Sequence, residues 1–280
     1  MAQRVSAIKT KVFHHSDFQN KEDLLAIEEP LEIRLGFGSS AERQQKSLAI
    51  TMRTPGNDEN LVVGFLFTEN IIHSLEQINY IDYCKDEDGQ KSENVIRVEL
   101  HEEIDLHWED LQRNFFTNSS CGICGKASIE NLEKICPTKL QNGFEIGPET
   151  IHSLENQMRK AQSVFEHTGG LHAAALYNEK GKIQILREDV GRHNALDKLI
   201  GEGLTRKIDF QKSIVLLSGR ASFELIQKSL MAGIPIVAAI GAPSSLAVET
   251  AENFNLTLCG FTRNSQFNIY SANQRIAPKK

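Results

Sequence analysis

Apolar and polar residues alternate along four short runs in the first third of the chain, a pattern typical of strands with one buried face. These runs are residues 29–38, 46–54, 78–84 and 94–100. Polar loops separate the first run from the second and the third from the fourth, and a helix is predicted between the pairs with Asp58 as its N-cap. The pattern predicts a small α+β domain over residues 1–115.

From Gly147 onward, amphipathic segments alternate with short, mostly apolar runs, which indicates helices between buried strands. The predicted helices cover residues 147–165, 192–204, 222–233 and 244–254, and the predicted strands cover 171–177, 182–188, 213–218, 234–240 and 256–261. This order predicts a layered α/β domain with a mostly parallel sheet over residues 147–280. A flexible segment with a helix at 126–135 is predicted to connect the two domains over residues 116–146.

Composition and charge narrow the range of partners. The 280 residues are 40% hydrophobic and 24% charged, which is typical of a globular protein with a substantial core. The formal net charge of −6 argues against broad binding to nucleic acid or to an anionic membrane. The N-terminal residues contain no apolar run of signal-peptide length, and no segment reaches the roughly 18 consecutive apolar residues of a membrane-spanning helix. We therefore expect a soluble, cytoplasmic protein without membrane or nucleic-acid partners.

Four loops rich in glycine and polar residues follow the predicted strands of the C-terminal domain. They are residues 187–194, 217–222, 240–245 and 260–265. The arginines of these loops are Arg187, Arg192, Arg220 and Arg263. In α/β sheets ligands collect at the carboxyl ends of strands, and arginines and helix N-termini both favour phosphate groups. The loops therefore suggest a phosphorylated ligand, although ordinary turns with solvated arginines would have the same composition.

Cys121 and Cys124 form a C-x-x-C pair in the stretch TNSSCGICGKAS, residues 117–128. Such a pair can form half of a zinc site, exchange disulfides or carry sulfur as a persulfide. The sequence contains no second C-x-x-C, C-x-x-H or H-x-x-x-H motif, although separated histidines could complete a zinc site: His152, His167, His172 and His193. The neighbouring serines and glycines give flexibility, and the position beside Lys126, before a predicted helix, favours a thiolate. These features fit sulfur transfer and redox chemistry nearly equally.

The other three cysteines are isolated in the sequence. Cys136 follows a predicted helix and Cys259 lies in an apolar run, so both are predicted to be buried small apolar side chains. Cys84 has no cysteine near it in the sequence. Only the C-x-x-C pair therefore calls for a chemical explanation.

Seven stretches of the sequence resemble the FdhD family, the formate dehydrogenase accessory sulfurtransferases. They are RTPGNDENLVVGFL, SSCGICGKASIE, TGGLHAAAL, EDVGRHNALDKLIG, SGRASFELIQK, AGIPIVAAIGAPSSLAVETA and LCGFTRNSQFNIYS, within residues 53–271. The resemblance implies a sulfurtransferase that accepts persulfide sulfur from a cysteine desulfurase and passes it to the molybdenum bis(molybdopterin guanine dinucleotide) cofactor. This cofactor is a bound substrate, and its sulfuration is required for formate dehydrogenase activity. By the same resemblance, Cys121 is the persulfide carrier and Cys124 its partner thiol.

The resemblance also implies where the guanine dinucleotide of that cofactor binds. The expected lining is the loop of Gly260, Phe261, Thr262, Arg263, Asn264 and Ser265. Arg220 of a neighbouring polar loop is a further candidate, and so is His193 as a hydrogen-bond donor at a predicted helix start, where a structural role fits the histidine equally well. The family forms homodimers, and we expect no permanently bound metal. The alternative function is a non-catalytic chaperone that binds the cofactor for formate dehydrogenase, with a cysteine pair that changes redox state or binds zinc.

The larger domain of this family is similar to the three-layer α/β fold of cytidine deaminases. Zinc deaminases carry H-x-E at the start of one helix and P-C-x-x-C at the start of the next. Here the corresponding starts read RHNAL, with Ala195 in place of the glutamate, and SGRAS, without a cysteine. His193 alone cannot form that metal site. We therefore expect a pocket for a nucleotide-like ligand without deaminase chemistry.

Overall fold

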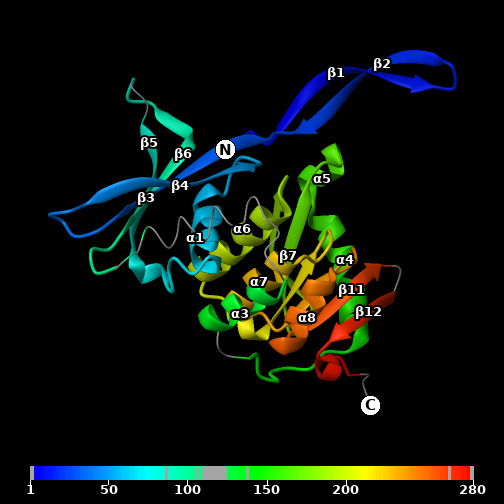
Figure 1. The fold of residues 1–280 in the computed structure, drawn as a ribbon. Helices are drawn as coiled ribbons and strands as arrows, with labels where there is room; N and C mark the ends of the chain where they lie inside the picture. The colour runs from blue at the N-terminus through cyan, green and yellow to red at the C-terminus, as the bar shows by residue number, and fades with distance from the viewer. Residues whose placement is uncertain are drawn as a thin grey trace.

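Three β-sheets and the helices packed against them make up the computed structural model of this chain (Figure 1). The structure describes residues 3–85, 88–104, 106, 108, 125–136, 139–263 and 266–277. Within these residues the three sheets contain two, four and six strands. None of the helices in these ranges is long and apolar enough to cross a membrane.

The four-stranded sheet has the strand order β4-β3-β6-β5 and packs one face on helix α1. Its elements are β3 (Glu29–Phe37), β4 (Gln44–Arg53), α1 (Asp58–Thr68), β5 (Ile78–Lys85) and β6 (Lys91–Leu100). Leu31 and Ile33 are buried in one cluster with apolar residues of α1, because alternate side chains of a strand point to the same face. All four predicted strands are confirmed. The predicted N-cap is wrong by one residue: Asn57 caps α1, and Asp58 pairs with the buried guanidinium of Arg53.

The six-stranded sheet has the strand order β12-β11-β10-β9-β7-β8. Its strands are β7 (His172–Asn178), β8 (Ile183–Asp189), β9 (Ser213–Leu217), β10 (Ile236–Ala239), β11 (Thr257–Arg263) and β12 (Gln266–Ser271). β10 is parallel to β9 and β11, whereas β7 is antiparallel to β8 and β9, and β12 is antiparallel to β11. The expectation of a mostly parallel sheet is therefore wrong. The sheet is mixed because β7 to β8 and β11 to β12 are short connections, which can join only antiparallel strands.

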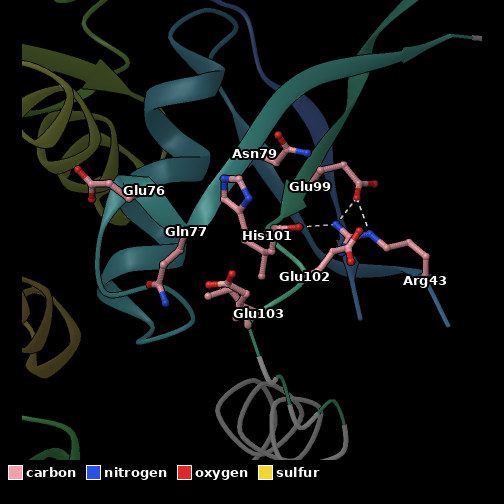
Figure 2. A pocket seen from close by; sticks show the side chains of 10 residues that line it. Arg43, Glu76, Gln77, Asn79, Glu99, His101, Glu102 and Glu103 are labelled. Atoms are coloured by element: carbon pink, nitrogen blue, oxygen red, sulfur yellow. Dashed lines mark hydrogen bonds and ion pairs between the residues drawn. The ribbon is translucent and has the colours of Figure 1, made fainter. Parts of the chain in front are cut away.

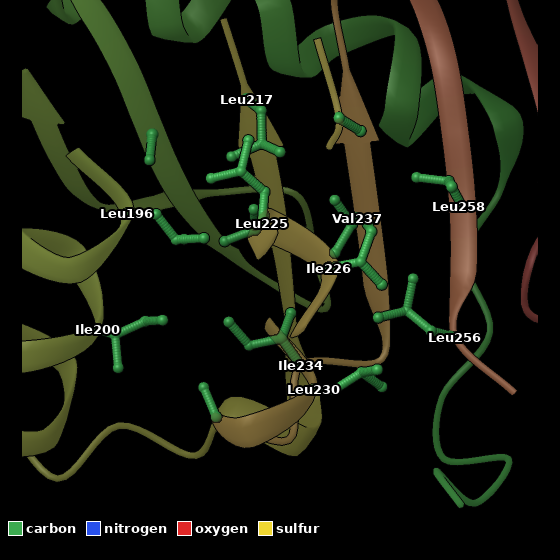
Figure 3. Close-up of a cluster of buried hydrophobic side chains, with 14 of the residues drawn as sticks. Leu196, Ile200, Leu217, Leu225, Ile226, Leu230, Ile234, Val237, Leu256 and Leu258 are labelled. Carbon is green, nitrogen blue, oxygen red and sulfur yellow. The ribbon is translucent and has the colours of Figure 1, made fainter. Parts of the chain in front are cut away.

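Helices cover both faces of the six-stranded sheet, so this domain has the expected three layers. The helices after the C-x-x-C pair are α3 (Gly125–Ile135), α4 (Pro148–Ala161), α5 (Ser163–Thr168), α6 (Arg192–Thr205), α7 (Phe223–Met231) and α8 (Ser245–Asn253). One face packs on α6, α7 and α8 through the core shown in Figure 3, and the other packs on α4. The helix predicted over residues 147–165 is two helices, because the backbone of Gln162 leaves the helical region with φ −78° and ψ 80°.

Helix α1, which covers the four-stranded sheet, also packs directly on α6. The two backbones approach so closely at Gly64 and Gly201 that neither position has room for a Cβ atom. Beside this contact the buried ammonium of Lys198 pairs with Asp189 and donates to the carbonyl of Thr54, shortly before α1. The α1–α6 contact therefore holds the four-stranded sheet against the C-terminal domain.

The sequence pattern does not predict the two-stranded sheet formed by β1 (Val5–His14) and β2 (Asp17–Ala26). The strands pair antiparallel along their whole length. Figure 1 shows this hairpin extending away from the rest of the molecule. Most of its side chains are exposed, so no one-sided apolar alternation marks it in the sequence.

Candidate functional site

The glycine-rich polar loops predicted from the sequence lie together where strands of the six-stranded sheet end. β8, β9, β10 and β11 all run in the same direction, since β8 and β9 are both antiparallel to β7 and β10 is parallel to β9 and β11. The carboxyl ends of these four strands therefore meet the start of β7 at this edge, which we call the carboxyl edge. The described residues of all four predicted loops lie there, in the position where ligands bind in α/β sheets.

The loops at the carboxyl edge are tied together by their backbones. The Gly241 amide donates to the Gly219 carbonyl, and the Phe261 amide donates to the Gly241 carbonyl. Ala221 and Pro243 form a β-bridge between the same loops. A Cβ atom at Gly241 would lie 2.9 Å from the Gly219 carbonyl oxygen, so a larger residue would push the loops apart. The loops after β9, β10 and β11 therefore form one continuous surface.

His193 and Arg220 are both predicted to bind the cofactor. His193 lies in the first turn of α6, and Arg220 lies on the neighbouring loop after β9. The Nε2 atom of His193 is 3.4 Å from the hydroxyl oxygen of Ser222, two residues after Arg220. Burial, together with the positive charge of Arg192, lowers the pKa of His193 to about 4, so its imidazole is neutral at pH 7. A neutral imidazole can donate one hydrogen bond but brings no charge to a ligand. The positive charge near this position comes instead from Arg192 and from the exposed side chain of Arg220.

The predicted cofactor loop begins in the last residues of β11. Its described members are Gly260, Phe261, Thr262 and Arg263, and its other two members, Asn264 and Ser265, lie outside the described residues. Phe261 is partly exposed and has a left-handed backbone with φ 54°. Arg263 is exposed, whereas Thr262 is buried and its hydroxyl has no hydrogen-bond partner among the described residues. Phe261 thus joins the surface shared with the β10 loop, and Arg263 lies at its end.

Arg187 does not belong to this surface, although the sequence analysis counts it among the loop arginines. Its guanidinium pairs with Glu202 of α6 and donates to the Leu186 carbonyl. Burial lowers the pKa of Arg187, and the ion pair with α6 occupies the side chain. The interpretation of Arg187 as a phosphate ligand is therefore wrong.

Asp189 positions the start of α6, which carries His193, and the sequence pattern does not single Asp189 out. Its fully buried carboxylate accepts hydrogen bonds from the amides of Thr54 and Gly191 and pairs with Lys198 at 2.6 Å. The partners come from the stretches RTPGND and EDVGRHNALDK, which lie far apart along the chain. Both stretches belong to the family resemblance, but nothing in their spacing indicates that they touch.

A cavity of about 700 Å³ lies away from the carboxyl edge, beside the four-stranded sheet (Figure 2). Its lining includes the carboxylates of Glu76, Glu99, Glu102 and Glu103, and its one lining arginine, Arg43, is paired with Glu99. Carboxylates repel phosphate groups, so this cavity does not fit the predicted anionic ligand. None of the predicted site residues within the described ranges lines it.

The residue at the position of the deaminase glutamate adds a methyl group to the apolar core and offers no carboxylate. Ala195, at the position of the deaminase glutamate, is completely buried at the start of α6. Among the described residues, no group of three or more His, Cys, Asp or Glu side chains is placed to hold a metal ion. The C-x-x-C pair, for which zinc binding is an alternative, lies outside these residues.

Comparison with known proteins identifies the family. The FdhD/NarQ family matches residues 26–277. This chain belongs to the FdhD/NarQ family. It is 46% identical to the sulfur carrier proteins FdhD of Mycolicibacterium paratuberculosis and Streptomyces avermitilis, over 91% of this chain and 92% and 89% of theirs. It is 43% identical to the sulfur carrier protein FdhD of Thermoplasma volcanium, over 91% of this chain and 90% of that protein.

A solved structure shares the fold of this FdhD/NarQ chain. It is the crystal structure of a protein from Desulfotalea psychrophila described as a formate dehydrogenase accessory protein, with a TM-score of 0.75 and 25% sequence identity. The match covers 98% of this chain and 100% of that one. The expected family and the expected α/β fold class are both confirmed.

In this FdhD/NarQ chain, the described residues on either side of the C-x-x-C pair pack on different cores. Before the pair, Trp108 stacks on Phe37 with ring centroids 5.5 Å apart and packs on the core of the four-stranded sheet. After the pair, α3 confirms the predicted connecting helix, and its residues Ile129 and Leu132 are buried in the core of the six-stranded sheet. The two cysteines themselves lie outside the described residues. The described residues that flank the pair are therefore anchored on two different sheets.

Proposed function

We propose that this chain is a sulfurtransferase of the sulfur carrier type that serves formate dehydrogenase. The observation that carries the proposal is its 46% identity, over 91% of the chain, to sulfur carrier proteins FdhD. Sulfur comes from a cysteine desulfurase as a persulfide, is carried on Cys121, and goes to the molybdenum bis(molybdopterin guanine dinucleotide) cofactor as the substrate. The partners are a cysteine desulfurase and formate dehydrogenase, and the working unit is a homodimer.

Loading of Cys121 is a thiol exchange. The Cys121 thiolate attacks the terminal sulfur of the donor persulfide; a new S–S bond forms, the old one breaks, and the donor cysteine leaves as a thiolate. The pair directly precedes α3, whose first turn contains no acidic residue and includes Lys126, and this position favours the thiolate. Cys124 then attacks the Cys121 sulfur and hydrosulfide leaves toward the substrate. A thiol reductant resets the Cys121–Cys124 disulfide.

The carboxyl edge supports binding of the guanine dinucleotide part of the substrate. The phosphates of the dinucleotide require positive charge and close approach to main-chain amides. The exposed side chains of Arg220 and Arg263 supply the charge. The lack of a side chain at Gly241 lets the β10 loop pack against the backbone of Gly219 and Arg220, which fixes the loop that carries Arg220. The neutral imidazole of His193 adds a hydrogen-bonding group for the base or ribose, whereas the buried Thr262 side chain supports the loop from inside.

The carrier and the substrate site share one domain in this proposal. Cys124 immediately precedes α3, and α3 is packed into the same core as the strands β9, β10 and β11 that end at the carboxyl edge. The other end of the segment is held by Trp108 on the four-stranded sheet. This arrangement supports a carrier segment that is tethered beside its acceptor.

Incubation of the purified protein with a cysteine desulfurase and cysteine is expected to add the mass of one sulfur atom to the peptide that contains residues 121–124. The measurement is mass spectrometry of a digest prepared without reductant. A thiol reductant should remove the added mass, and a sample without cysteine is the control. Folded protein that gains no sulfur on this peptide would contradict the sulfurtransferase proposal and favour the cofactor chaperone.

Replacing Arg263 with alanine is expected to weaken binding of guanosine diphosphate about 10- to 100-fold, because a hydrogen bond to a charged group contributes roughly 1.5–3 kcal/mol. Isothermal titration calorimetry measures the affinity. Persulfide loading of Cys121 should not change, since Arg263 takes no part in the thiol exchange. The matched control is Arg159→Ala, an exposed arginine of α4 on the other face of the sheet. Equal affinity in Arg263→Ala and the wild type would remove Arg263 from the site.

A further inference from the structure

Glu224 places an exposed carboxylate at the carboxyl edge. The described parts of the four loops, together with the first turn of α7, contain three carboxylates: Glu188, Asp189 and Glu224. Glu188 is buried and accepts hydrogen bonds from two amides in the first turn of α5. Asp189 is buried and paired with Lys198. The Glu224 side chain is 60% exposed, so it is the one carboxylate of these stretches that a ligand can reach.

The charge of the Glu224 carboxylate is free for a ligand. Partial burial would raise the pKa of Glu224, but hydrogen bonds from its own amide and from the Ser222 hydroxyl outweigh burial and lower the pKa, so the group is ionised at pH 7. Its one ion-pair candidate among the described residues is His193, whose Nε2 atom is 3.9 Å away. His193 is neutral at this pH and does not cancel the charge.

A carboxylate at this edge repels phosphate but fits a group that donates hydrogen bonds. Its two oxygens only accept, so it suits a part of the ligand with two donors side by side, as in bidentate pairing. Guanine presents such an edge, because its N1–H and its 2-amino group are neighbouring donors. Adenine and cytosine place an acceptor nitrogen beside their amino group, and uracil has one donor between two acceptors. Among these bases, guanine therefore fits a carboxylate best.

We propose that Glu224 selects guanine by accepting hydrogen bonds from N1–H and the 2-amino group of the base. The inference rests on the proposed function, because it names the residue that reads the base of the guanine dinucleotide. Ser222 and His193 are positioning residues. The Ser222 hydroxyl donates to the Glu224 carboxylate, and Nε2 of the His193 ring lies 3.4 Å from that hydroxyl oxygen.

The position of Glu224 lets one nucleotide also reach the arginine at the end of β11. Helix α7 follows β9, and the strands β9, β10 and β11 are neighbours in the sheet. Neighbouring strands lie about 4.8 Å apart, so β9 and β11 end about 10 Å apart across the sheet. An extended guanosine diphosphate is at least as long. With guanine at Glu224, the phosphates can reach Arg263, away from the repulsion of the carboxylate.

Four diphosphates that differ only in the base test this role by isothermal titration calorimetry: those of guanosine, inosine, adenosine and xanthosine. Inosine lacks the 2-amino group, so the wild type is expected to bind inosine diphosphate about 10- to 100-fold more weakly than guanosine diphosphate. Adenosine diphosphate should bind weakly to the wild type and to Glu224→Gln alike. In Glu224→Gln the affinity for guanosine diphosphate should fall about 10- to 100-fold, and the preference over inosine diphosphate should disappear, because the glutamine amide turns a donor toward the 2-amino group.

Xanthosine diphosphate separates a contact with the base from a loss of structure. Xanthine carries an oxygen where guanine carries the 2-amino group. The Glu224 carboxylate repels this oxygen, whereas the amide of a glutamine can donate to it. Glu224→Gln is therefore expected to bind xanthosine diphosphate about 10-fold more tightly than the wild type does. A damaged fold cannot produce such a gain.

The matched control is Glu249→Gln, which changes an exposed glutamate on the next helix, α8. This variant should bind all four nucleotides like the wild type. Equal binding of guanosine and inosine diphosphates by the wild type, or wild-type preferences in Glu224→Gln, would overturn the role of Glu224 and leave the sulfurtransferase proposal standing. A wild type that binds none of the four would overturn the nucleotide site at the carboxyl edge, and Glu224 with it. Persulfide loading of Cys121 is measured without nucleotide and tests sulfur transfer separately.

Discussion

A Cys121→Ala variant is expected to fold normally and to deliver no sulfur above background, a loss of at least about a hundredfold for removal of the attacking nucleophile. The structure explains why two of the described cysteines, Cys136 and Cys259, cannot take over. Cys259 is completely buried in β11, and burial raises its pKa to about 12. Burial also raises the pKa of Cys136. Both therefore remain thiols at neutral pH, and only a thiolate accepts persulfide sulfur efficiently.

The measurement is activity of formate dehydrogenase produced in cells that contain only the variant, together with the sulfur content of the purified carrier. Cys136→Ala is the matched control, because it removes a thiol from the end of the same helix without touching the carrier pair. Cys124→Ala should still load sulfur but release it slowly. Sulfur found on the 121–124 peptide of Cys121→Ala, with normal delivery, would contradict the role of Cys121.

Most strands and helices are predictable from the sequence because their burial is either one-sided or complete. In β3 the buried residues Leu31, Ile33 and Leu35 alternate with polar ones, which marks a strand with one face on a core. Every residue of β9 is buried, so its apolar run is continuous and short. In both strands the order of apolar and polar residues along the chain matches which side chains are buried, so the sequence pattern alone predicts the strand.

Elements whose surroundings come from distant parts of the chain are not predictable in this way. The β1–β2 hairpin is exposed on both faces, so its apolar residues follow no period. The amphipathic pattern runs unbroken through Gln162, because Met158 of α4 and Val164 of α5 are both buried, although the chain turns between them. The strand β12 is mostly exposed and short, and its pairing with β11 is what defines it.

The sequence predicts where the candidate site lies, but it predicts only some of the side chains that face outward there. Strand direction brings the loops to one edge, and this follows from the order of elements. Which side chains face outward depends on partners that the sequence does not place: Arg187 pairs with Glu202, and the Thr262 side chain points into the protein. The role of Cys121 comes from the family resemblance, since the C-x-x-C spacing alone fits three kinds of chemistry.

The largest loss of stability is expected from Lys228→Met. The buried ammonium of Lys228 on α7 lies 3.1 Å from Asp197 on α6 and 2.9 Å from Glu69 just after α1, and it donates to the hydroxyl of Thr68. Burial by itself would lower the pKa of Lys228, but the two carboxylates outweigh it and raise the pKa above its usual value. Methionine fills a similar volume and leaves both carboxylates without their cation. Breaking such a buried ion pair costs about 3–5 kcal/mol, which is roughly 10 °C in melting temperature for a chain of this size.

The stability lost in Lys228→Met should depend on pH, and the pKa of Asp197 decides whether the loss grows or shrinks as pH rises. In the wild type burial raises the pKa of Asp197 to about 6, against the opposing effect of Lys228, from an ordinary value of 3.8. Without Lys228 the pKa of Asp197 in the folded state rises further. At any pH between 3.8 and this raised pKa, Asp197 is therefore more often protonated in the folded state than in the unfolded state. The free energy of unfolding of the variant therefore falls as pH rises, and its deficit is larger at about pH 8 than at about pH 5.

Two further variants separate the ion pair from a general effect of losing a lysine. Lys212→Met removes an exposed lysine that pairs only weakly with the exposed Asp209, and it should change stability by less than about 0.5 kcal/mol. Lys228→Met/Asp197→Asn removes the charge that the single variant leaves buried, so it should be more stable than Lys228→Met alone. Urea denaturation at both pH values measures all four proteins. A Lys228→Met protein as stable as the Lys212→Met protein at high pH would show that the buried lysine does not hold α1, α6 and α7 together.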